Sequence, residues 1–262
     1  MVVRSSYYKI LASGISDIGS VRQNNEDMWA EVSDYRFFIL ADGMGGHQAG
    51  EIAAKETVNV LCRIIQKKIG PSMEVETLSS VQDTLRRAIE HVNLVVFKMG
   101  RAQPELRGMG TTVCCLLFHP DGVILAHVGD SRIYRMRNKI LTQITQDHSL
   151  VCDLLAQGQI DNRQADEFMY KNIITKAIGT EPRVTPSLCS QEIQFDDIYL
   201  MCSDGLSDLL TIEEMQNIMI TSSSLSIASQ ALVATANCKG GFDNITVVLA
   251  KVEGFNEQED IS

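Results

Sequence analysis

The sequence contains little that would divide the chain into separate parts. Its 262 residues include only five prolines, and no stretch is rich enough in proline, glycine or serine to act as a linker. Hydrophobic residues make up 45% of the chain, which is enough for one large core. We therefore predict one domain over residues 1–254, followed by a polar C-terminal tail over residues 255–262.

Long apolar runs and a surplus of positive charge are also absent. The longest apolar run, VCCLLF at 113–118, is far too short to span a membrane, and the N-terminus lacks the apolar core of a signal peptide. The formal net charge of -10 disfavours nucleic acid and anionic membranes as partners, because both are bound by clustered lysine and arginine. We predict a cytoplasmic protein whose acidic surplus favours cations.

Cysteines with the paired spacing of metal sites are missing. The seven cysteines are an odd number, none belongs to a CxxC motif, and Cys114 and Cys115 are adjacent in an apolar run. A disulfide framework or a thiolate zinc site would show paired spacing. We predict that all seven are small core side chains in a reducing compartment.

The chain does contain short apolar runs that alternate with amphipathic segments. Helical spacing of apolar residues predicts helices over 48–69 and 77–99, with shorter ones near 212–219 and 226–236. The strand candidates are 7–13, 28–33, 36–41, 111–119, 123–129, 131–137, 187–194, 197–203 and 244–252. This order favours an α+β fold with two sheets covered by helices, although periodicity does not give the strand order.

Three apolar runs end in an aspartate beside a glycine. FFILADG ends at Asp42, ILAHVGD ends at Asp130, and IYLMCSDG ends at Asp204. If these strands share sheets, their carboxylates can converge at loop starts. Further acidic residues directly before predicted strands are Glu26, Asp27 and Asp243.

Carboxylates that converge need a cation, because like charges a few ångströms apart force protonation or reduce stability. Mg²⁺ and Mn²⁺ prefer oxygen ligands, and the glycines after Asp42 would allow the main chain to approach such an ion. A single Asp-Gly pair is more often an ordinary turn, but five acidic clusters at inferred strand edges are harder to explain in this way. Arg22 could be a surface arginine or a clamp for the oxygens of a phosphate.

Seven motifs resemble, in order, those of the metal-dependent serine/threonine protein phosphatases, the type 2C family, in their bacterial form. They are VRQNNED at 21–27, ADGMGGHQAGEIA at 41–53, RGMGTT at 107–112, HVGDSRIYRM at 127–136, LTQITQDHS at 141–149, LMCSDGLSDLL at 200–210 and GGFDNITVVLA at 240–250. One such motif would be weak evidence, whereas the whole set is very specific. The resemblance implies a four-layer αββα sandwich of two packed antiparallel sheets flanked by helix pairs.

The resemblance also implies a set of metal ligands. Asp42 would bridge two metal ions, and the backbone carbonyl of Gly43, Asp204 and Asp243 would complete the protein ligands. Asp130 matches a carboxylate that, in bacterial members, holds a third and weaker metal together with Asp204. The implied cofactor is therefore Mn²⁺ or Mg²⁺, with two ions bound tightly and a third bound weakly.

Other residues match positions around these ligands. Glu26 and Asp27 resemble outer carboxylates that hold metal-bound waters, Arg22 resembles the phosphate clamp, and residues 150–175 resemble a mobile flap. The implied reaction is hydrolysis of phosphoserine and phosphothreonine by a water that two metals activate, without a covalent intermediate.

The chain departs from family patterns at two places. Animal members have a histidine directly after the Asp-Gly pair as the proposed acid, whereas this chain has Met44, and its nearest histidine is His47. We predict that a metal-bound water protonates the leaving group and that His47 is structural, because a helix start and nearby metals would lower its pKa. In the flap, residues 168–171 read FMYK instead of the usual His-Pro and Arg.

The remaining histidines have structural interpretations. His91 is expected on the polar side of a helix, His119 at a turn, and His127 on a strand. His148 follows Asp147 and is expected to order the loop that enters the flap.

Two other functions are compatible with parts of the pattern. A catalytically inactive relative would have lost metal carboxylates or Arg22, yet all are present. A hydrolase of small phosphate esters would use the same chemistry, so only substrate tests separate it from a protein phosphatase. The resemblance favours a monomer that acts on phosphorylated proteins, such as a serine/threonine kinase, its substrates or the antagonists of anti-sigma factors.

Overall fold

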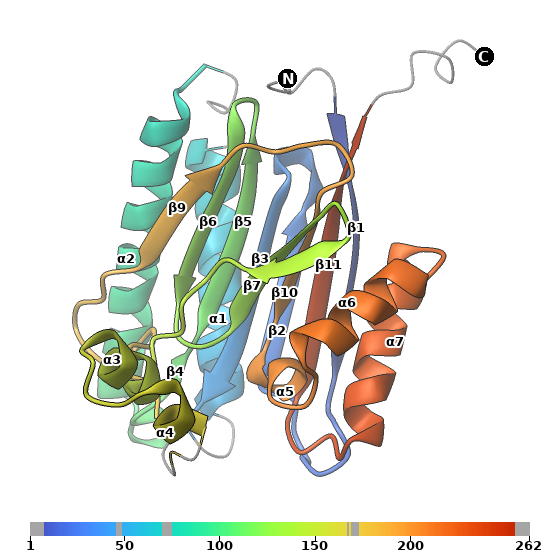
Figure 1. Ribbon diagram of the computed structural model, residues 1–262. Coiled ribbons are helices and arrows are strands. Elements are labelled where there is room, and N and C mark those ends of the chain that lie inside the picture. Colours follow the sequence, from blue (N-terminus) through green and yellow to red (C-terminus); the bar gives the residue numbers. More distant parts are fainter. Residues whose placement is uncertain (1–7, 46–48, 70–74, 167, 169–172, 255–262) are drawn as a thin grey trace.

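The computed structural model describes residues 8–45, 49–69, 75–166, 168 and 173–254, and its strands form two antiparallel sheets (Figure 1). The first sheet contains, in spatial order, β1 (Tyr8–Asp17), β11 (Ile245–Gly254), β10 (Ile198–Cys202), β7 (Arg132–Arg137) and β8 (Ile140–Gln143). The second contains β2 (Asp27–Val32), β3 (Phe37–Met44), β5 (Val113–His119), β6 (Gly122–Val128) and β9 (Ser187–Gln191), with β4 (Gly110–Thr111) paired to β3.

Helices cover the outer faces of both sheets (Figure 1). On the second sheet lie α1 (Ala49–Ile64), which continues as the π-helical turn η3 (Ile65–Ile69), and α2 (Leu78–Ala102). On the first sheet lie α6 (Ile212–Thr221) and α7 (Leu225–Cys238). The shorter helical elements are η2 (Ser33–Tyr35), η5 (Pro104–Leu106), α3 (Leu150–Ala156), α4 (Asn162–Asp166) and α5 (Asp204–Ser207).

Three apolar cores separate the four layers. One lies between α1, α2 and the second sheet, and another lies between α6, α7 and the first sheet. The third lies between the sheets, where Phe118 makes edge-to-face contacts with Phe38 and Tyr199. Alternate residues of β3 enter different cores, since Phe37 and Ile39 face the helices while Phe38 and Leu40 face the other sheet. The predicted αββα sandwich is confirmed.

Sequence periodicity found the long elements and missed short ones. The predicted strand 111–119 is divided into β4 and β5, and the strand β8 and the helix α5 were not predicted. The first predicted helix ends in η3. All seven cysteines are free, but Cys189 and Cys238 are exposed, so the prediction that every cysteine belongs to the core is wrong for these two.

Among the described residues, no helix is both long and apolar enough to cross a bilayer.

Candidate active site

Strands from both sheets bring acidic residues to the same end of the molecule, the lower end in Figure 1. Asp27 begins β2 and lies opposite Asp42 of β3 in the antiparallel register. Asp204 begins α5 directly after β10. Asp42 does not lie at a loop start as predicted, because β3 continues through Gly43 and Met44, which pair with β4.

Asp27 joins the two sheets. Its Oδ2 accepts hydrogen bonds from Ser203 Oγ and Thr246 Oγ1, both at 2.7 Å. Both of these hydroxyl groups come from the side of the site that the first sheet forms. Burial raises the pKa of Asp27 to about 6, although the two hydroxyl donors oppose this shift. Asp27 is therefore a buried structural carboxylate as well as a member of the acidic cluster.

Hydrogen bonds from the backbone of Asp42 to Thr111 and Thr112 hold this residue in place. Its N–H donates to Thr112 Oγ1 at 3.0 Å, and its carbonyl oxygen accepts from Thr112 N and Thr111 Oγ1, both at 2.8 Å. Burial raises the pKa of Asp42 well above its usual range, and the nearby charges of Asp27, Asp204, Asp130 and Asp243 raise it further.

Asp204 experiences the same repulsion. Its pKa rises to about 8 through burial first, and then through the charges of Asp130, Asp208 and other acidic neighbours. The part of these shifts that comes from neighbouring charges means that the ionised carboxylates repel one another, and a cation among them would relieve this repulsion.

Gly43 lies where three backbone segments meet. Its N–H donates to the carbonyl oxygen of Glu26 at 3.1 Å. A Cβ at this position would overlap the carbonyl of Gly50 in α1 and lie 2.7 Å from the carbonyl oxygen of Glu26. Only glycine fits this contact, which places the main chain after Asp42 against the start of α1.

Arg22 and Asp243 form an ion pair at the mouth of the site, with 2.6 Å between Arg22 Nη2 and Asp243 Oδ2. The adjacent Asn244 connects three segments, because its amide donates to the carbonyls of Ile18 and Asn24 and accepts from the N–H of Glu26. Burial raises the pKa of Glu26, and the charge of Arg22 opposes this rise.

Most of these residues, but not Asp27, line a cavity of about 900 Å³. The predicted site residues that line it are Arg22, Glu26, Asp42, Gly43, Asp204 and Asp243. Sequence reasoning gave no role to Glu51, Thr112 or Asn244, which also line it and lie inside the quoted motifs. The sequence signal that could have identified these three residues is their position inside the quoted motifs.

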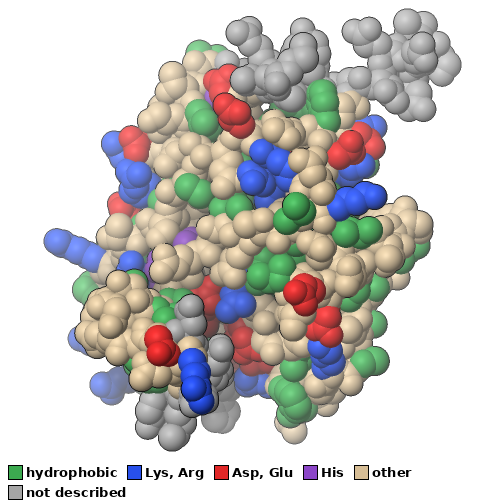
Figure 2. Space-filling view, in the orientation of Figure 1, with side chains coloured by type: hydrophobic (Ala, Val, Ile, Leu, Met, Phe, Trp, Pro, Cys, Tyr) green, Lys and Arg blue, Asp and Glu red, His purple; other side chains and the backbone are tan. Residues whose placement is uncertain are grey.

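Asp130 lines a neighbouring cavity of about 440 Å³ and not the first one. Asp204 lines both cavities, so the two spaces share one carboxylate. Figure 2 shows acidic side chains in the recess between the lobe of α3 and α4 and the side of α5. Burial raises the pKa of Asp130 to about 6, and its buried Oδ1 has no hydrogen-bond partner among the described residues.

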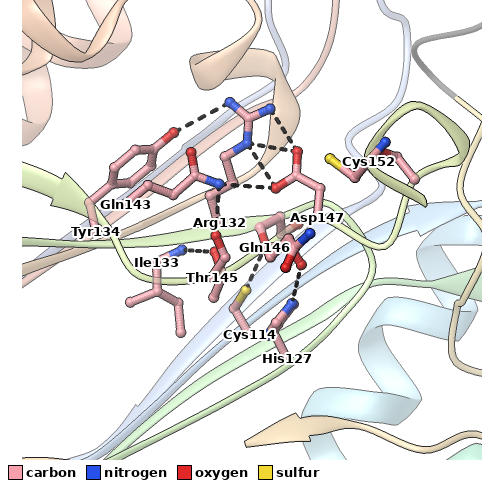
Figure 3. Close-up of polar contacts among 12 residues, drawn as sticks. Cys114, His127, Arg132, Ile133, Tyr134, Gln143, Thr145, Gln146, Asp147 and Cys152 are labelled. Atoms are coloured by element: carbon pink, nitrogen blue, oxygen red, sulfur yellow. Dashed lines mark hydrogen bonds and ion pairs between the residues drawn. The ribbon is translucent and has the colours of Figure 1, made fainter. Parts of the chain in front are cut away.

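The segment before α3 is fastened to β7 (Figure 3). Asp147 accepts hydrogen bonds from Nε and Nη2 of Arg132, the shortest at 2.7 Å. His148 Nδ1 accepts the N–H of Gly129 at 3.1 Å, so its Nε2 carries the proton and bonds Ser187 Oγ at 2.9 Å. His148 therefore orders the entry to the flap as predicted, and it stacks on His127 with 4.6 Å between ring centroids.

The residues present suit hard divalent cations. In the part of the chain that the structure describes, no three aspartate, glutamate, histidine or cysteine side chains are positioned to hold one ion together. Mg²⁺ and similar ions commonly use only one or two carboxylates and complete their coordination with waters. The unpartnered Oδ1 of Asp130 and the acidic cavity that Asp204 shares fit such ligation.

Two predicted features cannot be placed. His47 lies outside the described residues, and so does most of the departing flap sequence, at 169–171. Met44 ends β3 and lines the larger cavity, where its thioether has no proton to donate.

Comparison with known proteins gives consistent matches along the chain. The model of the family described as Protein phosphatase 2C matches residues 18–236. The serine/threonine phosphatase Stp of Listeria monocytogenes is 34% identical over 250 residues, which cover 94% of this chain and 98% of the relative.

Solved structures agree in fold. The serine/threonine phosphatase of S. agalactiae has a TM-score of 0.85 and 36% identity, and the match covers 93% of this chain and 100% of that one. The catalytic domain of the serine/threonine protein phosphatase PstP in complex with two manganese ions has a TM-score of 0.80 and 34% identity, covering 94% of this chain and 99% of that one.

Proposed function

The chain belongs to the protein phosphatase 2C family and is a bacterial-type serine/threonine protein phosphatase, and we propose that its reaction takes place in the cavity that Arg22, Asp42 and Asp204 line. One observation carries this proposal. Carboxylates from both sheets converge at one end with pKa values raised by burial and by each other. A site with this charge distribution favours divalent cations and, with them, a phosphate group.

We assign the metal ligands to four carboxylates and one backbone carbonyl. Asp42, the carbonyl of Gly43, Asp204 and Asp243 would hold two tightly bound ions, either Mn²⁺ or Mg²⁺, and Asp130 would hold a third, weaker ion together with Asp204. When bound, these ions supply a hydroxide nucleophile at neutral pH and offset the charge that develops on the phosphoryl oxygens. The manganese complex of PstP supports the choice of metal.

The remaining residues would bind the substrate and position the ligands. Glu26 and Asp27 would hold the waters around the metals, and both hydroxyl bonds of Asp27 are made to its Oδ2. Arg22 would exchange its ion pair with Asp243 for the phosphate oxygens, which a planar guanidinium binds in pairs. Water would protonate the leaving serine or threonine oxygen, because Met44 has no proton to give, and His47 would be structural.

The biological setting follows from the same proposal. Residues 1–254 would form the catalytic domain and residues 255–262 a polar tail, in a cytoplasmic monomer. Its substrates would be phosphorylated proteins, such as a serine/threonine kinase, the targets of that kinase or antagonists of anti-sigma factors. Nucleic acid and membranes are not expected as partners, given the net charge of -10.

The test is metal removal and substrate choice in one experiment. Enzyme dialysed against EDTA should lose its activity on a phosphothreonine peptide and regain it with Mn²⁺ or Mg²⁺, but not with a thiol reductant. Phosphotyrosine peptide and sugar phosphates should be much poorer substrates. Full activity in EDTA would refute the two-metal site, and a preference for sugar phosphates would refute protein substrates.

The leaving-group assignment needs a separate comparison. His47→Ala and wild-type enzyme are assayed on p-nitrophenyl phosphate and on a phosphothreonine peptide at saturating Mn²⁺. Nitrophenolate leaves without protonation, so loss of a general acid would slow only the peptide, by about 10²–10⁴-fold. Equal effects on both substrates are expected if water is the proton donor, and a selective loss of peptide activity would identify His47 as the acid.

A further inference from the structure

Two large apolar side chains are exposed beside the phosphate clamp. Val21 directly precedes Arg22, and Phe242 directly precedes Asp243. Val21 is 60% exposed and also lines the larger cavity, whereas Phe242 is 64% exposed and lies outside its lining. The apolar rim, defined as these two residues, therefore begins inside the polar site and continues onto the surface.

The two segments of the rim run side by side. Ser20 N donates to the carbonyl oxygen of Gly241 at 2.8 Å, and Arg22 Nη2 lies 2.6 Å from Asp243 Oδ2. These contacts lie on either side of Val21 and Phe242 in sequence, so the two residues occupy matching places on adjacent loops. In Figure 1 the connection from β1 to β2 and the segment from α7 to β11 lie together at the lower end.

Backbone geometry holds the rim in place. Gly240 and Gly241 have φ values of +132° and +51°, in the region that favours glycine. A Cβ at Gly240 would overlap the phenyl ring of Phe242, so the ring lies against this glycine. Asn237 Oδ1 accepts from Ser20 Oγ and so joins the end of α7 to the opposite loop. The exposed phenyl group is thus preorganised for contact.

An exposed valine or phenylalanine alone would need no explanation. Here the two residues are paired on adjacent loops at the mouth of a cavity whose charged lining residues, apart from Arg22, are all acidic. A substrate whose phosphate lies at Arg22 must pass its main chain over one edge of this mouth. Exposed aromatic residues on rigid loops are typical anchors for a partner side chain.

We propose that Val21 and Phe242 form a subsite for an apolar side chain next to the phosphorylated residue of a protein substrate. This inference rests on the proposed function, since it assumes that phosphate binds at Arg22. The occupant is a segment of a phosphoprotein, held by its phosphate in the cavity and by a neighbouring leucine-like side chain on the rim. Burial of part of that side chain should favour apolar-flanked sites by about fivefold in kcat/KM.

The test compares two phosphothreonine peptides of equal charge, one with leucine and one with serine on both sides of the phosphothreonine. Wild-type enzyme should prefer the leucine peptide by about fivefold. In Phe242→Ser and Val21→Ser the ratio of the two kcat/KM values should fall to within about twofold of one. Phe242→Leu should retain the preference, because it keeps an apolar surface.

The matched control is Ile140→Ser. Ile140 is also 64% exposed but begins β8, and it does not line the larger cavity. This variant should keep the wild-type preference. The subsite is refuted if wild-type enzyme does not discriminate between the peptides, if Phe242→Ser retains the preference, or if Ile140→Ser loses it. Failure of folded wild-type enzyme to hydrolyse either peptide would instead refute the proposed function.

Discussion

Two groups of buried and half-buried carboxylates differ in how their charge is balanced. Asp147 and Asp197 each form an ion pair with an arginine, at 2.7 Å from Arg132 and 2.6 Å from Arg137. In the described part of the chain, no lysine, arginine or histidine forms an ion pair with any member of the second group. Its members are Asp27, Asp42, Asp130 and Asp204.

The comparison separates two uses of the same side chain. A buried carboxylate with its own arginine is neutralised inside the fold and fastens one segment to another, as Asp147 fastens the flap entry to β7. Buried carboxylates that face one another have raised pKa values and reduce stability until a cation is present. Under the proposed function the unpaired group would therefore hold the metals, whereas the paired group fastens segments together, although Asp147 lines the same cavity as Asp130 and Asp204.

The largest expected effect comes from neutralising one unpaired carboxylate. Asp42→Asn and Asp204→Asn should each lower turnover of a phosphothreonine peptide by about 10³-fold, because each would remove one of the proposed anionic metal ligands. Each metal-free variant should also be at least as heat-stable as the wild type, since one repelling charge is gone. Kinetics in Mn²⁺ and thermal unfolding in EDTA check both statements. A near wild-type rate would show that the ligand is misplaced.

The paired group should respond in the opposite way. The Asp197 side chain is 0% exposed, and Asp197→Asn leaves the charge of Arg137 without its partner. This substitution should lower the free energy of unfolding by about 3 kcal/mol. Urea denaturation measures the change. The control is Asp196→Asn, whose 80% exposed side chain pairs with Lys251 and should matter by less than about 0.5 kcal/mol. Equal effects at the two positions would remove the distinction between the groups.

The pH dependence of the metal-free protein sharpens the comparison further. Asp204 has a folded-state pKa of about 8, far above that of an unfolded aspartate, so the folded state binds more protons than the unfolded state between these values. Stability is therefore present at low pH and lost as pH rises. Burial lowers the pKa of His148 to about 4, so this residue makes stability rise with pH, and it does so only below pH 6.5.

The informative window is thus pH 6.5 to 8. Between these values the metal-free protein should lose about 1–2 kcal/mol of stability, which Mn²⁺ should restore. Thermal unfolding at both pH values, with EDTA or with Mn²⁺, measures this. A stability that rises with pH in EDTA would contradict the raised pKa of Asp204.

The smallest effect is expected at Arg22, whose ion pair with Asp243 is exposed. Arg22→Ala should change stability by less than about 0.5 kcal/mol, since both side chains are more than one third exposed. It should raise KM for phosphopeptides several-fold and leave metal affinity intact, because it would remove the proposed phosphate contact. Calorimetry with Mn²⁺ and steady-state kinetics test this. An unchanged KM together with an unchanged kcat would make Arg22 an ordinary surface residue.

The sequence predicted the unpaired group better than the paired one. Asp42, Asp130 and Asp204 each follow an apolar run, and the strands of such runs end at one edge of the sheets. Nothing in the sequence pairs Arg137 with Asp197, which is 60 residues away, because that contact depends on the order of β7 and β10 in the sheet. Periodicity does not contain the strand order.

Local contacts explain the other differences. Asp42 lies within a strand because β4, only two residues long, extends the pairing of β3. β8 was missed because only Leu141 among its four residues is buried, so it lacks an apolar run. Asp130 faces a separate cavity that α3 and α5 enclose. These helices are so short that the sequence shows little helical periodicity for them.

The hydrogen bonds of Asp27 have a mechanical consequence. The two sheets face each other through a largely apolar core, which a few polar contacts cross, such as the hydrogen bond from the Tyr8 hydroxyl in β1 to the carbonyl of His119 in β5. At the lower end, one oxygen atom of Asp27 on β2 accepts hydrogen bonds from Ser203 and Thr246. Ser203 follows β10 and Thr246 belongs to β11, both strands of the opposite sheet. A slide of about 1 Å would break both bonds. Because Asp27 pairs with Asp42 and Ser203 directly precedes Asp204, these bonds help to fix the position of Asp42 relative to Asp204.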